Sequence, residues 1–194
     1  MTALAIDPGH TGAVALVSEG RLLTWAAWRR TRRRAEPYDV VSSAWRGGHA
    51  SCLTHAVRVA YMHLDPAADR TGAVAVVEGI RQHGARTGTI ALAESAGVAV
   101  AVLWGLVGEA HRPHYQTWTR DVLGCSMGAA SGYSLAGWGW GPDPDAGSAR
   151  GASRYPYGRG VVDCQPPPGW AREHVADAAW MARWGEVQEK PCTP

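Results

Sequence analysis

The sequence contains no phenylalanine, and Lys190 is the only lysine among its nineteen lysine and arginine residues. Its net charge of +2 is too small to indicate a nucleic-acid-binding protein by itself. The excess of arginine has two explanations: a GC-rich genome, or a need for the bidentate phosphate contacts that arginine makes. With 46% apolar and 19% charged residues, the 194-residue chain has the composition of one globular domain.

The four cysteines lie far apart and form no Cys-x-x-Cys pair: Cys52, Cys125, Cys164 and Cys192. This spacing supports neither a zinc site nor a redox motif. The longest nearly apolar stretch, residues 96–107, is shorter than a helix that spans a bilayer, and no signal peptide opens the chain. We therefore expect a cytoplasmic protein with free thiols and no membrane partner.

The first stretch, residues 2–6, is short and apolar, which predicts a buried strand. Asp7-Pro8-Gly9 follows it and predicts a tight turn with an acid where the strand ends. Residues 13–17 and 21–28 predict two further strands, joined by Glu19-Gly20 as an antiparallel hairpin. An isolated aspartate in such a turn can equally well cap the backbone.

A second strand of this kind, residues 73–77, ends in the single acid Glu78, and its apolar run predicts a strand covered on both faces. The last predicted helix, residues 171–184, carries His174 and Asp177 on one face because they are three residues apart. With Asp7, these side chains can converge as three carboxylates and an imidazole. Such ligands suit Mg²⁺ or Mn²⁺, and two such ions would activate a water for phosphodiester hydrolysis.

Other helices are predicted at residues 50–64, from Thr89 to about residue 108, and at residues 118–123. Thr89 and Thr117 are the expected N-caps of the second and third, Gly124 is expected to end the third, and residues 111–116 predict a short strand. Gly97 and Gly105 lie inside the second helix, where glycine costs about 1 kcal/mol, so close packing against another element is expected.

Two arginine-rich regions are candidates for DNA binding. Five arginines between residues 29 and 34 form either a solvated tip or a phosphate-binding patch, and we favour the patch. Residues 125–169, here called the 125–169 segment, mix glycine, proline and aromatics, and predict no helix or strand before Val161. This segment is either a low-complexity linker or a mobile surface that stacks on unpaired bases. The candidate contacts are Arg29, Arg30, Arg32, Arg33, Arg34, Trp138, Trp140, Arg154 and Arg159.

Three short motifs occur in a fixed order: Ala5-Ile6-Asp7-Pro8-Gly9, Val76-Val77-Glu78 and His174-Val175-Ala176-Asp177-Ala178. Their order, and their places on two strands and a helix, resemble the RuvC-type Holliday junction resolvases of the ribonuclease H-like superfamily. Further similar landmarks are Thr87-Gly88-Thr89, Ala96-Gly97 and the run 118–124, so the resemblance spans residues 3 to about 185.

This resemblance implies an α/β, ribonuclease H-like fold with a mixed five-stranded sheet flanked by helices. It implies one RuvC-like nuclease domain over residues 1–194, with an insert at about 125–169. It also implies that Asp7, Glu78, His174 and Asp177 are catalytic ligands of two Mg²⁺ or Mn²⁺ ions. The protein would act as a homodimer on branched DNA, the four-way Holliday junction.

The chain departs from the family pattern in two places. Family members often carry an aromatic shortly after the second acid, whereas Gly79-Ile80-Arg81 follows Glu78 here. The family also tends to carry lysines after the Trp118 region, whereas this chain offers Arg120. Arg81 and Arg120 are therefore further candidate DNA contacts. The compact form and altered insert are more similar to a phage-encoded relative than to a housekeeping bacterial enzyme.

Three other functions stay open. The first is another nuclease of the superfamily, such as a ribonuclease H or a flap and branch nuclease. The second is a junction-binding module without catalysis, which the four filled metal positions argue against. The third is an actin-like or sugar-kinase ATPase, because the Asp7-Pro8-Gly9 turn with Thr11-Gly12 resembles their first phosphate loop. The chain is too short for their two domains and contains no P-loop.

Overall fold

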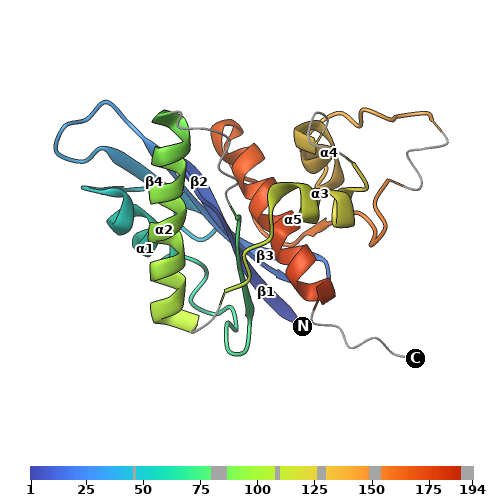
Figure 1. The fold of residues 1–194 in the computed structure, drawn as a ribbon, viewed down its shortest axis with the longest axis horizontal. Coiled ribbons are helices and arrows are strands. Elements are labelled where there is room, and N and C mark those ends of the chain that lie inside the picture. The colour runs from blue at the N-terminus through green and yellow to red at the C-terminus, as the bar shows by residue number, and fades with distance from the viewer. Residues whose placement is uncertain (46, 80–86, 108–109, 126–129, 149–153, 189–194) are drawn as a thin grey trace.

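The computed structural model describes residues 1–194 except 46, 80–86, 108–109, 126–129, 149–153 and 189–194. The chain forms a mixed β-sheet with helices against both faces (Figure 1). In chain order the elements are β1 (Thr2–Asp7), β2 (Thr11–Ser18), β3 (Arg21–Arg30), β4 (Tyr38–Ser42), β5 (Gly48–Ala50), α1 (Leu53–Met62), β6 (Val74–Val77), α2 (Thr87–Val107), α3 (Tyr115–Leu123), α4 (Ala130–Gly137), β7 (Val161–Val162), η3 (Gly169–Ala171) and α5 (Arg172–Gln188).

The strand order is β5-β4-β3-β2-β1-β6, with β7 paired to β3, which makes seven strands in the described part of the chain. β1 is antiparallel to β2 and parallel to β6, and β2 and β3 form the predicted hairpin. The predicted α/β fold, a mixed sheet flanked by helices, is confirmed, although the sheet has seven strands in the described residues instead of five. The strand predicted at residues 111–116 is reduced to two parallel bridges, made by His111 and His114 beyond β6.

The central strands divide their side chains between two cores because successive residues point to opposite faces. Ala3 and Ala5 belong to the core beneath α5, whereas Leu4 and Ile6 belong to the core beneath α1 and α2. Burial on both faces explains why these strands are uninterrupted apolar runs. A Cβ at Gly185 of α5 would lie 2.8 Å from a β6 side chain, so this glycine lets the helix lie close to the sheet.

The long helix α2 differs from its prediction in two respects. It begins at Thr87, so Thr89 lies within the helix and does not cap it. Gly97 and Gly105 are exposed, and no atom lies within 4 Å of a Cβ built at either position. The prediction that these glycines pack closely against another element of this chain is therefore wrong for the described residues.

The helix α3 begins earlier than predicted but ends as predicted. Its N-cap is His114, whose Nδ1 accepts a hydrogen bond from the Gln116 amide at 3.3 Å, so Thr117 is not the cap. Gly124 ends the helix in the left-handed conformation, with φ of 59°. A glycine adopts this conformation without the steric cost that a side chain would bring.

The 125–169 segment contains one helix and a short strand among turns in its described parts. It contains α4, so the prediction of no helix before Val161 is wrong, whereas β7 does begin at Val161. Trp138 is only 3% exposed, and its ring centre lies 5.1 Å from that of Trp180 in α5. A Cβ at Gly160 would lie 2.1 Å from the Trp138 ring, and one at Gly137 would lie 2.4 Å from Trp180. These glycines therefore make room for tryptophan rings against the backbone.

Cys52, Cys125 and Cys164 carry free thiols, and Cys192 lies outside the described residues. Among the helices that the structure describes, none combines the length and the apolar character that crossing a membrane requires.

Candidate active site at the ends of β1 and β6

Four polar side chains meet where two parallel strands leave the core. Asp7 ends β1, and Glu78 follows β6 directly. Ile6 pairs with Val77 in parallel register, so the two acids emerge at the same edge of the sheet. The first two turns of α5 bring His174 and Asp177 to this edge.

Asp7 and His174 form the direct contact of this group. His174 Nδ1 lies 2.6 Å from Asp7 Oδ2, and the two side chains are 32% and 14% exposed. Burial raises the pKa of Asp7, although the hydrogen bond and charge of His174 act in the opposite direction. Burial lowers the pKa of His174, but the hydrogen bond and charge of Asp7 outweigh it, and the net direction is upward.

The other two carboxyl groups are held against ionisation. Burial, followed by the negative charge of Asp7, raises the pKa of Glu78 to about 8. The same two causes raise the pKa of Asp177 well above its usual range. Three carboxyl groups are thus crowded in a poorly solvated space. A proton or a cation must offset their negative charges.

Two partners that sequence reasoning did not assign orient these carboxyl groups. The Ser134 hydroxyl donates to Asp177 Oδ1 at 2.6 Å, and the Trp118 indole N–H donates to Glu78 Oε1 at 3.2 Å. Ser134 is fully buried in α4, within the 125–169 segment. No local pattern identifies Ser134, because the sequence predicts no helix here and because its partner Asp177 lies 43 residues further along the chain. From the sequence, Trp118 is identifiable only as part of the run 118–124 that resembles the family.

Two further residues lie close enough to interact electrostatically with the carboxyl groups of the site. Glu173, beside His174 on α5, is exposed and accepts a hydrogen bond from the Ser131 hydroxyl at 2.7 Å. Burial, followed by the charges of Asp177 and Glu78, raises the pKa of Tyr115. Tyr115 therefore lies at the margin of the site, at the start of α3.

The donor set has the chemistry of a divalent-cation site. Carboxylate oxygens are the preferred ligands of Mg²⁺ and Mn²⁺, and a cation would offset the repulsion that raises the pKa values of Glu78 and Asp177. Within the part of the chain that the structure describes, no three His, Cys, Asp or Glu side chains are already arranged to hold a metal ion. The residues thus fit such an ion by the chemistry of their ligand atoms, and not by an arrangement that is already formed.

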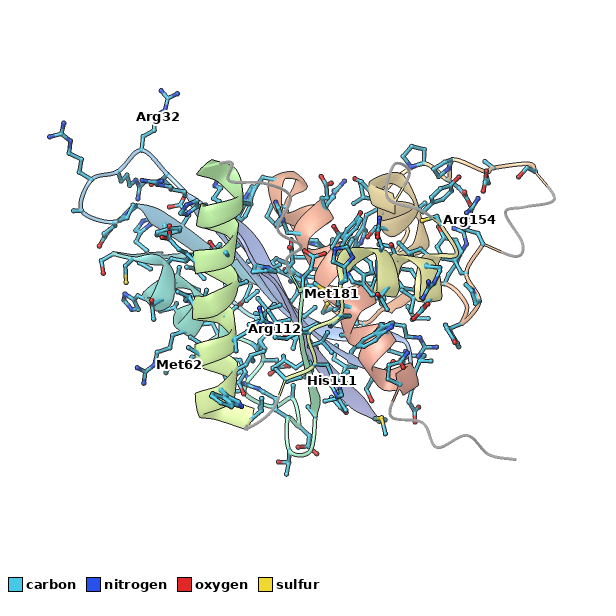
Figure 2. All side chains as sticks on the ribbon, viewed as in Figure 1. Arg32, Met62, His111, Arg112, Arg154 and Met181 are labelled. Carbon is cyan, nitrogen blue, oxygen red and sulfur yellow. The ribbon has the colours of Figure 1, made fainter. Side chains whose placement is uncertain are left out.

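The predicted DNA contacts near β3 lie at the surface. Arg29 and Arg30 end β3, and the arginines of the loop that follows are exposed. Figure 2 shows Arg32 pointing into solvent from this loop. The Arg120 side chain is 74% exposed on α3. Arg81 lies outside the described residues.

The predicted contacts of the 125–169 segment are mostly engaged within the protein. Trp138 is a core residue, so the expectation that it stacks on DNA is wrong, because no face of its ring is open. Trp140 is partly buried, with its ring centre 6.3 Å from that of Trp138. Arg154 pairs with Asp145 at 2.7 Å and is 16% exposed. Arg159 pairs with Asp143 and retains an exposed fraction of 50%.

No protein-family model matches this chain, and no curated protein matches it. Among solved structures, the fold is similar to that of RuvC from Thermus thermophilus, with a TM-score of 0.42 and 11% identity. That likeness covers 94% of this chain and 91% of the other. T. thermophilus RuvC in complex with a Holliday junction substrate gives a TM-score of 0.41 and 14% identity, covering 94% and 90%. Any function proposed for this chain therefore rests on its own site.

Proposed function

We propose that this protein is a Mg²⁺- or Mn²⁺-dependent endonuclease that hydrolyses phosphodiester bonds in branched DNA, with the Holliday junction as its main substrate. The observation that carries the proposal is the meeting of Asp7, Glu78 and Asp177 with His174 at one edge of the sheet. A structural role alone does not explain three crowded carboxyl groups, because their repulsion opposes folding.

Each residue of the site has a distinct role in this proposal. Asp7, Glu78 and Asp177 would hold two metal ions, with His174 as the fourth ligand. Bound ions of this kind supply an activated water and stabilise the leaving oxygen of a phosphodiester. Ser134 donates to one oxygen of Asp177, and Trp118 donates to one oxygen of Glu78. Each donor would thereby orient the other carboxyl oxygen toward a bound metal ion. The 125–169 segment would thus be an insert of one nuclease domain that supports the site.

Charge beside the site supports a nucleic-acid substrate. Arg29 pairs in register with Thr11, and the Arg30 amide donates to the His10 carbonyl at 3.0 Å, in the turn that follows Asp7. Exposed arginines here can neutralise phosphates of a strand that reaches the carboxyl groups. The resemblance of the three sequence motifs to RuvC-type resolvases favours a four-way junction over a flap or an RNA–DNA hybrid.

A homodimer is the assembly that such a substrate requires, because two symmetric cuts need two sites related by a two-fold axis. The outer face of α2 supports a second copy as the partner. Gly97, Ala101 and Gly105 are exposed along it, and Trp104 is 67% exposed. Small residues beside an exposed aromatic allow two helices to approach closely. We expect Ala101→Glu with Trp104→Glu to give monomers, as measured by light scattering, that nick a single strand.

The direct test is cleavage of synthetic DNA by the purified protein. A four-way junction, a flap, an RNA–DNA hybrid and plain duplex are compared in Mg²⁺, in Mn²⁺ and in EDTA. The proposal expects metal-dependent cutting of the junction above the other three. Preferential cutting of the flap or the hybrid would instead favour the other nucleases of the superfamily. Junction binding without cleavage in either metal would leave a binding module.

A further inference from the structure

A pocket lies outside the candidate active site, at the same end of the sheet but toward the β5 side. It is a pocket of about 410 Å³ between the end of β3, β4, the start of β5 and η3. Its polar lining consists of Arg29, Arg33, Asp39, His49 and Trp170, and two valines of β4 and two glycines complete it. Its volume is within the range of small-ligand pockets.

The fold connects this pocket to the candidate active site on two sides. Arg29 lies in β3 opposite Thr11, the first residue of β2 after the Asp7 turn. Trp170 lies in η3, which contacts β2 and leads directly into the α5 turn that carries His174. The arginine loop after β3 and the first turn of α5 lie toward the same side of the molecule (Figure 1).

One carboxylate organises the charged groups of the pocket. Asp39 Oδ2 lies 3.5 Å from an Arg29 nitrogen, and Asp39 Oδ1 lies 2.9 Å from His49 Nδ1. The Arg33 guanidinium lies 2.6 Å from His49 Nε2. A guanidinium can only donate, so His49 Nε2 accepts from Arg33. Asp39 therefore lies within ion-pair distance of Arg29 and of His49, and His49 in turn contacts Arg33.

The arginines keep donors for a ligand because one acid cannot satisfy two guanidinium groups. The Arg29 guanidinium lies 4.7 Å from the centre of the Trp170 ring, and its side chain is 45% exposed. The arginine over the tryptophan ring stands beside the partly buried side chain of Val41, whereas the neighbouring Val40 is fully buried on the other face of the sheet. Guanidinium groups suit phosphate, and flat apolar surfaces suit a nucleobase.

We propose that this pocket binds one nucleotide of an unpaired DNA strand, with its phosphate on Arg29 and Arg33 and its base against Trp170 and Val41. This inference rests on the proposed function, because it supplies the unpaired strand that a junction presents beside the scissile bond. A base in duplex DNA is stacked on its neighbours and cannot enter. The pocket also supplies the aromatic contact that no residue directly after Glu78 provides.

The test measures binding of wild type and variants in EDTA, where no strand is cut. Fluorescence anisotropy compares a short single-stranded oligonucleotide with a duplex of matched length. Arg29→Ala and Trp170→Ala should each weaken single-strand binding by about fivefold or more, the lower end for one base–aromatic contact, and duplex binding by less than about twofold. Arg29→Ala should also reduce the salt dependence of single-strand binding by about one phosphate contact.

The matched control is Arg21→Ala at the opposite end of β3. Arg21 is 52% exposed and is held by two hydrogen bonds to Asp163, a closer pair than that of Arg29 with Asp39, and no aromatic ring is paired with it in the described residues. Arg21→Ala should leave single-strand binding unchanged. An equal loss of single-strand binding in Arg21→Ala and Arg29→Ala would show that the arginines act only by non-specific charge, and would overturn the proposal. Unchanged single-strand binding by Arg29→Ala would also overturn it.

Two additions keep the result decisive. If Trp170→Ala fails to fold, Trp170→Phe retains a flat ring and should bind like wild type, while Arg29→Ala alone decides the question. Cleavage is assayed separately in Mg²⁺. A protein that cuts no substrate but loses single-strand binding in the pocket variants would refute the nuclease and keep the pocket. If the wild type cuts junctions and the pocket variants bind single strands like wild type, the nuclease is kept and the pocket is refuted.

Discussion

Two regions of this protein combine arginine with aromatic rings, yet they use the combination in opposite ways. In the pocket at the end of β3, Arg29 stacks on Trp170 and stays 45% exposed. In the 125–169 segment, Arg154 stacks 4.1 Å from the centre of the Tyr133 ring, pairs with Asp145, and is 16% exposed. The two regions lie at opposite ends of the view in Figure 2, where Arg32 and Arg154 are labelled.

The difference lies in what surrounds each stack. Arg154 also donates to the Gly124 carbonyl at 3.1 Å, so its hydrogen-bond donors are engaged in holding the segment to α3. Tyr155 stacks on Trp180 with ring centres 5.6 Å apart, which continues the core of α5 into the segment. An arginine beside an aromatic is therefore a ligand contact only where its donors remain unsatisfied.

The largest expected effect separates the carboxyl groups of the site from acids elsewhere. Asp7→Asn, Glu78→Gln and Asp177→Asn should each abolish junction cleavage, because each removes a metal ligand, and each should preserve the fold or stabilise it, because a repelling charge is lost. Gel assays of cleavage and thermal denaturation measure both properties. Asp163→Asn, at the β7 end of the sheet, is the control and should cut normally. Full activity in any of the three variants would remove that residue from the site.

The next effect separates the buried rings of the 125–169 segment from exposed ones. Trp138→Ala should lower the free energy of unfolding by about 3–5 kcal/mol, because it leaves a cavity against Trp180. Trp104→Ala on α2 should change it by less than about 0.5 kcal/mol in the monomer, because that ring is 67% exposed. Chemical denaturation measures both variants. Similar stabilities for the two would show that Trp138 is not a core residue.

Stability should also depend on pH in a direction set by the site. Glu78 has a folded-state pKa of about 8, against an ordinary value of 4.5, so the folded protein retains a proton that the unfolded chain releases. The free energy of unfolding should fall as pH rises from about 5 to about 8, by up to about 1.4 kcal/mol per pH unit for this proton. Thermal denaturation in EDTA measures the decline.

Two variations of that experiment locate its cause. Glu78→Gln should reduce the decline, because glutamine has no proton to lose, and the remaining part comes from Asp7 and Asp177, whose pKa values are also raised. Millimolar Mg²⁺ or Mn²⁺ should also flatten it if the carboxyl groups bind the ion, because a cation then offsets the charges. A decline that is unaffected by both changes would place the responsible groups outside the site.

A smaller effect tests whether the 125–169 segment takes part in catalysis. Ser134→Ala removes the donor to Asp177 and should lower cleavage by about 10–100-fold, the usual cost of losing a partner that orients a metal ligand. Ser131→Ala is the control on the same helix, since its partner Glu173 is exposed. Metal titration separates the roles, because an orienting residue should raise the Mg²⁺ concentration needed for half-maximal cutting. Equal activity of the two variants would make the segment purely structural.

The smallest effect returns to the two arginines. Arg154→Ala should cost about 1–3 kcal/mol of stability, because it leaves the partly buried Asp145 and the Gly124 carbonyl without their donor. Arg29→Ala should cost no more than about 1 kcal/mol, the usual range for an exposed ion pair. Urea denaturation compares the two. A larger loss of stability in Arg29→Ala than in Arg154→Ala would mean that Arg29 has the structural role and that Arg154 is the one available to bind a ligand.

Much of the fold could be predicted because local hydrophobic patterns in the sequence indicate its strands and helices. Uninterrupted apolar runs identified β1, β2 and β6, and a three-residue spacing placed His174 and Asp177 together on α5. The four proposed ligands were found for the same reason, since each stands at the end of a strand or on one face of a helix. Thr87 as the start of α2 and His114 as the cap of α3 were missed, because several residues near a helix end can serve as its cap.

By itself, then, the sequence determined the central strands, the helices that flank them and the four polar residues that meet at one edge. Only the tertiary structure decided whether a glycine-rich stretch would be mobile or packed. Glycine permits both, and the outcome in residues 125–169 depends on Trp180 of α5 lying against Gly137. The tertiary structure also decided which side chains are partners, as for Ser134 with Asp177 and Arg29 with Trp170. Such contacts join segments far apart in the chain, and they exist only once the sheet has brought its edges together.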